Sequence, residues 1–266
     1  MIDPPRTWHH GIVARYWAEF NVAEPTELAF WRAAISVAGE PVLDVGCGTG
    51  RLLVPLLAEG VDIDGTDISP DMLAYAEAAA RGTGRTPLLR AQASHELDLP
   101  RRYRTVFACG SFGIGGRRDR DLETLRRIHR HLEPGGTLVM DQQLANDRSE
   151  EVWTRWLPGR SWSPRPWPEH GERRRAANGD EIELETRLIV FDPIEARHTL
   201  EIRARLWRGG ALVGEETGAL EESLYLVPEV RLMLTTAGFG EVRVEGPYTG
   251  RPAVATDGTV VFVARR

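Results

Sequence analysis

The residues best suited to chemistry lie in the stretch PVLDVGCGTG, at positions 41–50. Four residues, Val42 to Val45, predict a short buried strand, and Gly46, Gly48 and Gly50 follow it at once. A glycine turn after a parallel strand lets a ligand approach the backbone closely, because no Cβ is in the way. By itself such a turn is a weak signal, since glycines also gather wherever a strand simply meets a helix.

Two acidic residues strengthen the signal of this turn. Asp44 lies just before it, and Asp67 ends the next predicted strand, VDIDGTD. An acid at the end of the second strand is placed to accept hydrogen bonds from the hydroxyl pair of a ribose. The pattern therefore predicts a nucleoside-containing ligand at the carboxyl edge of a parallel sheet.

The motif D-V-G-C-G-T-G, followed by D-I-S-P-D-M-L, resembles the S-adenosylmethionine-binding half of the class I methyltransferases. In the dehydrogenase fingerprint the third glycine comes three residues after the second, whereas Gly50 is two after Gly48, which favours the methyl donor over a dinucleotide. The resemblance covers about Pro41 to Gln142 and resumes in the last forty residues. The region between is similar to a looser group of bacterial small-molecule methyltransferases that carry a strand-rich insertion.

This resemblance implies S-adenosylmethionine as cofactor and S-adenosylhomocysteine as product. In the family the Met-Leu pair opens a helix packed near the adenine, and an acid after the third strand accepts a hydrogen bond from the adenine amino group. Gln92 occupies that position here, and a glutamine carbonyl can accept the same bond. The expected cofactor residues are Asp44, Gly46, Cys47, Gly48, Gly50, Asp67, Ile68, Met72, Gln92, Ala93, Cys109 and Ser111.

Five further residues are candidates for positioning the methyl acceptor. In falling order they are Tyr16, His95, Gln142, Gln143 and Tyr225. Relatives often use a tyrosine of the N-terminal helices in this way, although Tyr16 and Trp17 would equally pack a helical lid against the core. A lone histidine in a loop is more often structural than catalytic. The two glutamines follow the fifth strand at the edge where open α/β sheets bind ligands.

The elements that must position these residues alternate along the chain. Two helices are predicted between about residues 10 and 39, and strands at 42–46, 61–66, 87–92, TVFACG and TLVMDQ alternate with helices at 70–81 and 119–132. This order predicts an α/β fold, a Rossmann-like methyltransferase sheet with helices on both faces. Ser69 is expected to cap the helix that begins at Pro70. A last helix, VPEVRLMLTTAGF, and two strands that pair antiparallel complete the sheet.

The segment after the fifth strand has a different pattern. Residues 144–180 contain Trp153, Trp156, Trp162 and Trp167, which either line a substrate site or form a small core of their own. Three stretches with a period of two follow, separated by Asp192-Pro193 and Gly209-Gly210, and predict an antiparallel meander. We therefore expect a helical lid at 1–40, a cofactor-binding core at 41–145, an antiparallel β insertion at 146–225 and a return to the core at 226–266.

Composition limits the classes of function. The net charge of −6 disfavours nucleic acid as a partner. No long apolar run or export signal is present, so we expect a cytoplasmic enzyme that does not bind membranes and whose two cysteines are reduced. The histidines lack metal-ligand spacing, so no metal is predicted. The function expected is methyl transfer to an N or O atom of a small molecule, in a protein that dimerises through the insertion. The alternatives are a non-catalytic S-adenosylmethionine-binding protein and a nucleotide-dependent oxidoreductase.

Overall fold

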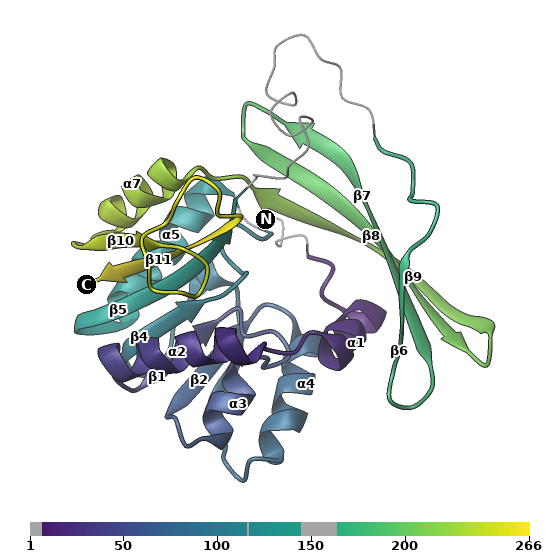
Figure 1. The fold of residues 1–266 in the computed structure, drawn as a ribbon, viewed down its shortest axis with the longest axis horizontal. Coiled ribbons are helices and arrows are strands. Elements are labelled where there is room, and N and C mark those ends of the chain that lie inside the picture. Colours follow the sequence, from purple (N-terminus) through teal and green to yellow (C-terminus); the bar gives the residue numbers. More distant parts are fainter. Residues whose placement is uncertain (1–6, 116, 145–163) are drawn as a thin grey trace. The chain divides into compact units, whose positions relative to one another are not determined.

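The computed structural model describes residues 7–115, 117–144 and 164–266, and these form two compact units (Figure 1). Of the described residues, the core unit comprises 23–112, 118–144 and 225–266. The sheet unit comprises 7–22, 113–115, 117 and 164–224. Within the described residues, no helix is long and apolar enough to cross a lipid bilayer.

The core unit is built on a seven-stranded sheet with the order β10-β11-β5-β4-β1-β2-β3. Its parallel part consists of β1 (Val42–Val45), β2 (Ile63–Asp67), β3 (Leu89–Ala91), β4 (Tyr103–Ala108) and β5 (Leu132–Gln143). At one side β11 (Thr259–Arg265) pairs antiparallel with both β5 and β10 (Val242–Glu245). The ends of β1, β2, β4 and β5 therefore meet at one edge, as the sequence predicts.

Helices cover both faces of this sheet, and each face has its own apolar core (Figure 1). On one face α2 (Pro25–Ala38) and α3 (Leu53–Ala58) pack around Trp31, Phe107 and Val139. On the other face α5 (Arg118–His131) and α7 (Val227–Ala237) pack around Ile128, Leu138 and Phe262. The two-sided burial is what a mostly parallel sheet requires.

The helix after β2 illustrates how local signals set an element's bounds. Helix α4 spans Pro70–Arg81, the range predicted from sequence. The Ser69 hydroxyl accepts the Met72 backbone N–H at 3.2 Å, which satisfies one of the free donors at the helix start, and Pro70 supplies a pre-set φ angle. The predicted cap is confirmed.

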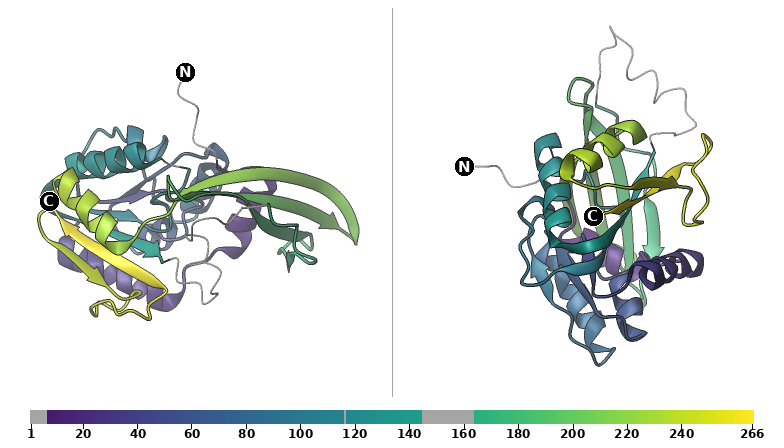
Figure 2. Two further views of the ribbon diagram at one scale, coloured as in Figure 1. Left: turned by 90° about the horizontal axis from the view of Figure 1, so that it is seen from above. Right: turned by 90° about the vertical axis from the view of Figure 1, so that its left-hand side faces the viewer.

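The sheet unit contains the predicted meander. Strands β7 (Glu181–Asp192), β8 (Arg197–Arg208) and β9 (Ala211–Ser223) are antiparallel neighbours, and β6 (Glu172–Arg175) adds an edge strand. The long strands curve strongly along their length (Figure 2). Ile182, Ile202 and Ala204 point to one face and bury the apolar side of α1 (Gly11–Phe20).

The two units differ from the predicted division of the chain at its N-terminus. Both predicted N-terminal helices form, but α1 belongs to the sheet unit and α2 to the core unit. The physical reason is that α1 presents Ile12, Val13 and Tyr16 to the strands of the meander. Of the four tryptophans of the insertion, Trp153, Trp156 and Trp162 lie outside the described residues. The Trp167 ring packs against the guanidinium groups of Arg187 and Arg203, which lie 4.4 and 4.5 Å from its centre.

Candidate functional site

The glycine turn after β1 is tightly packed against its neighbours. Gly46, Gly48 and Gly50 have φ angles of 77°, 55° and 85°, in the left-handed region that favours glycine. A Cβ on Gly46 would lie 2.4 Å from the Cβ of Ser111, and one on Gly50 would lie 2.7 Å from a methyl of Val54. Both the backbone conformation and the space therefore require glycine at the ends of this turn.

Asp67 connects the turn to the end of the second strand. One carboxylate oxygen accepts the Gly48 N–H at 2.9 Å, and the other accepts the Ser69 N–H at 2.8 Å. Ile68 is half-buried and Met72 is buried, with the Met72 methyl close to Gly48. The structure thus brings these predicted cofactor residues together.

Asp44 belongs to β1, two residues before Gly46, and is only 3% exposed. Burial raises its pKa to about 7, Arg51 opposes this shift, and Asp67 adds to it. Cys47 is buried beside it, and burial together with Asp44 and Asp67 raises the pKa of the thiol. Asp44 therefore changes charge near neutral pH, whereas Cys47 stays protonated.

Gln92 follows β3 and offers an unpaired donor. Its backbone N–H donates to the Asp67 carbonyl at 2.9 Å, and its side-chain oxygen accepts the Asp98 N–H at 3.3 Å. The side-chain nitrogen is buried and has no hydrogen-bond partner in the described part of the chain. Ala93 is buried next to it. A buried amide donor without a partner is costly, so this atom suits a ligand that brings an acceptor.

His95 lies on a short 3₁₀ helix, η1 (Ser94–Glu96). Its ring nitrogen is 3.9 Å from Glu96, and burial lowers its pKa, with Arg120 and Arg127 acting in the same direction. A histidine with a lowered pKa is neutral at pH 7 and keeps one nitrogen able to accept a proton. The assignment of His95 to the acceptor stays a prediction.

A further polar cluster occupies the ends of β4 and β5. Asp141 accepts the Gly110 N–H at 2.5 Å and the Tyr248 hydroxyl at 2.7 Å, and Cys109 Sγ lies 3.6 Å from the same carboxylate. The Ser111 hydroxyl donates to the Val45 carbonyl at 2.8 Å. Sequence reasoning found Cys109 and Ser111 but missed Asp141 and Tyr248.

Two more charged residues of this edge were missed. Arg51, the first residue after the turn, forms an ion pair with Glu27 of α2 and lies 3.2 Å from Cys109 Sγ. The sequence did carry a usable signal for two of the missed residues. Arg51 directly follows Gly50 of the glycine motif, and Asp141 directly precedes Gln142 near the end of a predicted strand. No local signal marks Glu27 or Tyr248, because each comes from an element distant in sequence.

The candidates for acceptor positioning have different surroundings. Tyr225 is buried and its hydroxyl donates to Asp121 at 2.6 Å. The Gln142 side-chain nitrogen donates to the Tyr225 carbonyl at 2.7 Å, while its side-chain oxygen is buried and has no partner among the described residues. Gln143, the next residue, is exposed. The structure therefore pairs Gln142 with Tyr225 and leaves Gln142 an acceptor atom.

Tyr16 belongs to the sheet unit and has the contacts of a packing residue there. Its ring is buried, packs edge to face on Phe20 at 4.9 Å, and lies 5.7 Å from the Arg174 guanidinium. Burial, with Glu172 next, raises the pKa of its hydroxyl to about 12. These contacts are those of the packing interpretation of Tyr16.

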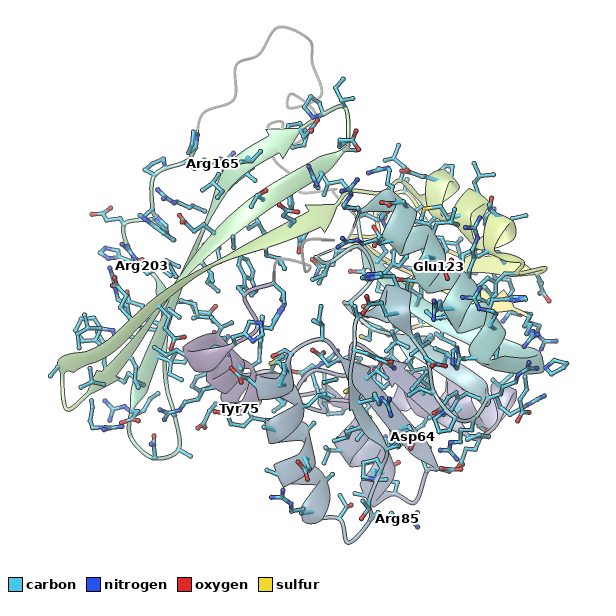
Figure 3. The ribbon with its side chains drawn as sticks, turned by 180° about the vertical axis from the view of Figure 1, so that it is seen from behind. Asp64, Tyr75, Arg85, Glu123, Arg165 and Arg203 are labelled. Atoms are coloured by element: carbon cyan, nitrogen blue, oxygen red, sulfur yellow. The ribbon has the colours of Figure 1, made fainter. Side chains whose placement is uncertain are left out.

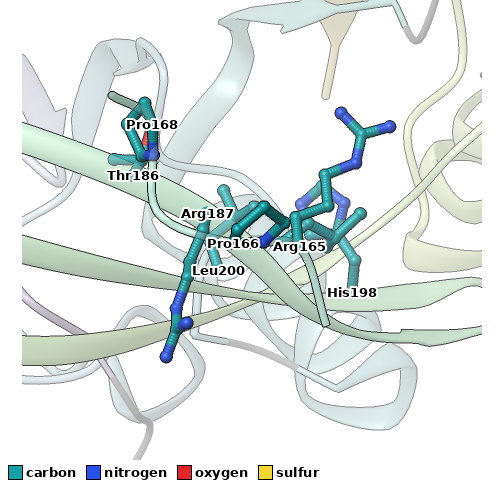
Figure 4. A pocket seen from close by; sticks show the side chains of 8 residues that line it. Arg165, Pro166, Pro168, Thr186, Arg187, His198 and Leu200 are labelled. Carbon is teal, nitrogen blue, oxygen red and sulfur yellow. The ribbon is translucent and has the colours of Figure 1, made fainter. Parts of the chain in front are cut away.

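The sheet unit also contains a cavity of about 380 Å³ (Figure 4). Leu188 and Leu200 supply apolar surface, and Arg165 and His198 supply polar groups. Glu222 holds a ring nitrogen of His198 at 2.5 Å. None of the residues predicted from sequence lines this cavity.

Residues 42–136 match the family model described as a methyltransferase domain. Among curated relatives, a ubiquinone biosynthesis O-methyltransferase of Azorhizobium caulinodans is 29% identical over 73% of this chain and 86% of its own.

Solved structures of low sequence identity share the fold. An S-adenosylmethionine-dependent methyltransferase of Clostridium acetobutylicum has a TM-score of 0.72 at 16% identity and covers 94% of this chain and 96% of its own. A sugar N-methyltransferase of Streptoalloteichus sp. has a TM-score of 0.65 at 20% identity, with 91% and 87% covered. The similarity extends over both units, because each comparison covers more than nine-tenths of the chain.

Proposed function

We propose that this class I S-adenosylmethionine-dependent methyltransferase transfers the methyl group to a nitrogen or oxygen atom of a small molecule. The observation that carries the proposal is the arrangement at the carboxyl edge of the core sheet. Three glycines in left-handed conformation lie between the buried Asp44 and the half-buried Asp67. This arrangement fits a donor in which a ribose joins a base to a charged amino-acid group.

The residues present suit each part of that donor. Asp67, at the end of the second strand, would accept hydrogen bonds from the ribose hydroxyls. The unpaired amide nitrogen of Gln92 is a hydrogen-bond donor, so it would pair with an adenine ring nitrogen rather than with the adenine amino group expected from sequence. Asp44 in its charged form would attract the positively charged methionine half, which lies along the turn at Gly46 and Gly48.

The chemistry requires placement more than reactive side chains. The acceptor's lone pair forms a bond to the methyl carbon while the carbon–sulfur bond breaks, and the sulfonium becomes a neutral thioether. Holding the two reactants in line at about 3 Å can supply roughly 7 to 11 kcal/mol. An amine acceptor loses its proton after transfer, whereas a hydroxyl acceptor needs a base or a low pKa of its own.

Gln142 now ranks first among the acceptor-positioning candidates. Its unpaired side-chain oxygen would accept a hydrogen bond from an N–H or O–H of the acceptor. Tyr225 supports it by holding the amide nitrogen and is itself held by Asp121. The names of the two relatives, one an O-methyltransferase and the other a sugar N-methyltransferase, support a hydroxyl or amine on a small molecule as the methylated group.

We also propose that the protein works in the cytoplasm as a dimer formed through the sheet unit, on small molecules and not on nucleic acid or membranes. The two free cysteines support a reducing compartment, and the net charge of −6 disfavours nucleic acid. Sedimentation of the intact protein tests the dimer. A monomer at micromolar concentration would contradict it.

The experiment for the proposed function combines binding and turnover. Calorimetry with S-adenosylmethionine, S-adenosylhomocysteine and NAD tests the donor, and a panel of amino sugars and phenols tests the acceptor, with S-adenosylhomocysteine and methylated product detected by mass spectrometry. We expect binding of the first two ligands and turnover with at least one acceptor class. Tight binding of NAD alone would overturn the proposal. Donor binding without product across the whole panel would favour a non-catalytic protein.

A further inference from the structure

A hydrogen-bonded network at the carboxyl edge of the core sheet links the last hairpin of the chain to the glycine turn. It comprises Asp141 at the end of β5, Tyr248 in the connection between β10 and β11, and the segment Cys109–Ser111, here named the β4 loop. All three belong to the core unit. The chemistry proposed above uses neither Asp141 nor Tyr248.

Both carboxylate oxygens of Asp141 are engaged by different segments. One accepts the Gly110 N–H at 2.5 Å, and the other accepts the Tyr248 hydroxyl at 2.7 Å. Asp141 is 8% exposed, so both bonds are largely shielded from water. Hydrogen bonds to a shielded carboxylate are stronger than neutral ones and fix the side chain's orientation. The hairpin and the β4 loop are therefore held through one carboxylate.

Tyr248 adopts a backbone conformation that tyrosine rarely takes. Its φ angle is 49°, in the left-handed region. The ring packs against Phe30 and Trp31 of α2, with centroids 5.7 and 6.1 Å away, and the hydroxyl reaches Asp141. Burial and the nearby Asp141 raise the pKa of this hydroxyl, so it remains a donor at physiological pH. Unusual backbone conformations persist where surrounding contacts define them, and they concentrate at functional sites.

The β4 loop connects Asp141 and Tyr248 to the glycine turn. The Ser111 hydroxyl donates to the Val45 carbonyl, and the Ser111 Cβ occupies the space that a side chain on Gly46 would need. Cys109 Sγ lies 3.2 Å from the guanidinium of Arg51, the residue that follows the turn. A shift of the β4 loop would therefore change the shape of the turn at two points.

We propose that Tyr248 and Asp141 are positioning residues for the methyl donor, which hold the β4 loop in the place that keeps the glycine turn open to the methionine half. The inference rests on the proposed function, because the donor is taken to lie along that turn. A purely structural pair would contribute to stability alone. A positioning pair also sets donor affinity.

The substitution Tyr248→Phe separates these roles, because it keeps the ring on Phe30 and Trp31 and removes only the hydroxyl. The matched control is Tyr75→Phe, a half-exposed tyrosine of α4 in the same unit (Figure 3). Calorimetry should give a dissociation constant for S-adenosylmethionine about tenfold weaker in Tyr248→Phe, which corresponds to about 1.4 kcal/mol. The control should match the wild-type protein, and the KM for any acceptor should change little in both variants.

A second pair of variants, Asp141→Asn and Asp141→Ala, distinguishes weaker donor binding from loss of folding. Asp141→Asn keeps an oxygen for the Gly110 N–H and places an amide against the Tyr248 hydroxyl, which can then act as acceptor. It should weaken donor binding less than Asp141→Ala does. Equal donor affinity in folded wild-type protein, Tyr248→Phe and Asp141→Asn would overturn the positioning role, even if melting temperatures fell. Absence of donor binding to the wild-type protein would instead refute the proposed function itself.

Discussion

Charged residues are used in opposite ways by the carboxyl edge of the core sheet and by the meander of the sheet unit. In the meander, register places Glu183 opposite Arg205, Glu185 opposite Arg203 and Arg187 opposite Glu201. All three pairs form ion pairs across the strands. At the core edge, the buried Asp141 accepts the Gly110 N–H and the Tyr248 hydroxyl, and the buried Asp44 interacts electrostatically with Arg51 and Asp67.

The difference shows what each arrangement can do. Neighbouring strands supply a partner for each charge in the meander, so these pairs are complete before any ligand arrives and contribute modestly to stability. At the core edge, topology gathers acids around a turn that excludes side chains, and the buried Asp44 has a raised pKa because it is poorly solvated. The side-chain nitrogen of Gln92 and the side-chain oxygen of Gln142, which have no partner among the described residues of this unit, are the groups left to interact with a ligand.

The largest loss of donor affinity is expected when a side chain is added to the glycine turn after β1. Gly46→Ala forces a Cβ to within 2.4 Å of Ser111 Cβ, whereas Gly209→Ala at a hairpin turn meets nothing within 4 Å. Both positions have positive φ, so each variant should lose about 1 to 2 kcal/mol of unfolding free energy through backbone strain, and Gly46→Ala should lose more because of its clash with Ser111. Only Gly46→Ala should weaken donor binding, by more than about 100-fold. Calorimetry and urea unfolding check this, and equal donor affinity in the two variants would contradict it.

Removal of the Asp67 carboxylate, which we expect to bind the ribose, should cause the next largest loss of donor affinity. Asp67→Ala deletes a carboxylate that also holds the Gly48 and Ser69 N–H groups. Loss of charged hydrogen bonds at about 1.5 to 3 kcal/mol predicts donor affinity about 10- to 100-fold weaker. The control is Asp62→Ala, because Asp62 directly precedes the first residue of β2, whereas Asp67 is the last residue of that strand. Unchanged affinity in folded Asp67→Ala protein would show that the ribose lies elsewhere.

Donor affinity should depend on pH through Asp44. Because its pKa is raised to about 7, the carboxyl is mostly protonated at pH 6 and mostly charged at pH 8. The charged form attracts the positively charged donor, so affinity should tighten about tenfold from pH 6 to pH 8. For the same reason the ligand-free protein should lose stability as pH rises through 7. Asp44→Asn should abolish both trends, and a persisting binding trend in that variant would assign it to another group.

The smallest effect on donor affinity is expected from a substitution in the cross-strand ion pairs of the meander. Arg203→Met removes an ion-pair partner from Glu185, which is buried, although Arg205 lies 3.6 Å from the same carboxylate. We expect about 1 kcal/mol lower unfolding free energy and donor affinity within about twofold of wild type. Urea unfolding and calorimetry measure the two quantities. A large loss of donor affinity would contradict the separation of the two regions.

Much of the fold and several residues of the site can be predicted from local sequence patterns. The glycine turn, the α4 cap at Ser69 and the alternating strands of the meander are each specified by residues close in sequence. The motif residues Asp44, Asp67 and Gln92 were predictable for the same reason, since Asp44 is next to the last residue of β1, Asp67 ends β2 and Gln92 directly follows β3. Local periodicity and strand ends are what sequence reasoning detects best.

Other features of the site depend on the tertiary structure alone. Tyr248 reaches Asp141 only because the last hairpin pairs antiparallel beside β5, and Glu27 reaches Arg51 only because α2 packs over the edge. The assignment of α1 to the sheet unit is of the same kind, because its apolar face fits the meander's strands. The sequence by itself predicted the donor, through a motif of contiguous residues. Only tertiary packing decided which distant side chains restrain the turn, because those contacts join segments separated by about a hundred residues in the case of Asp141 and Tyr248.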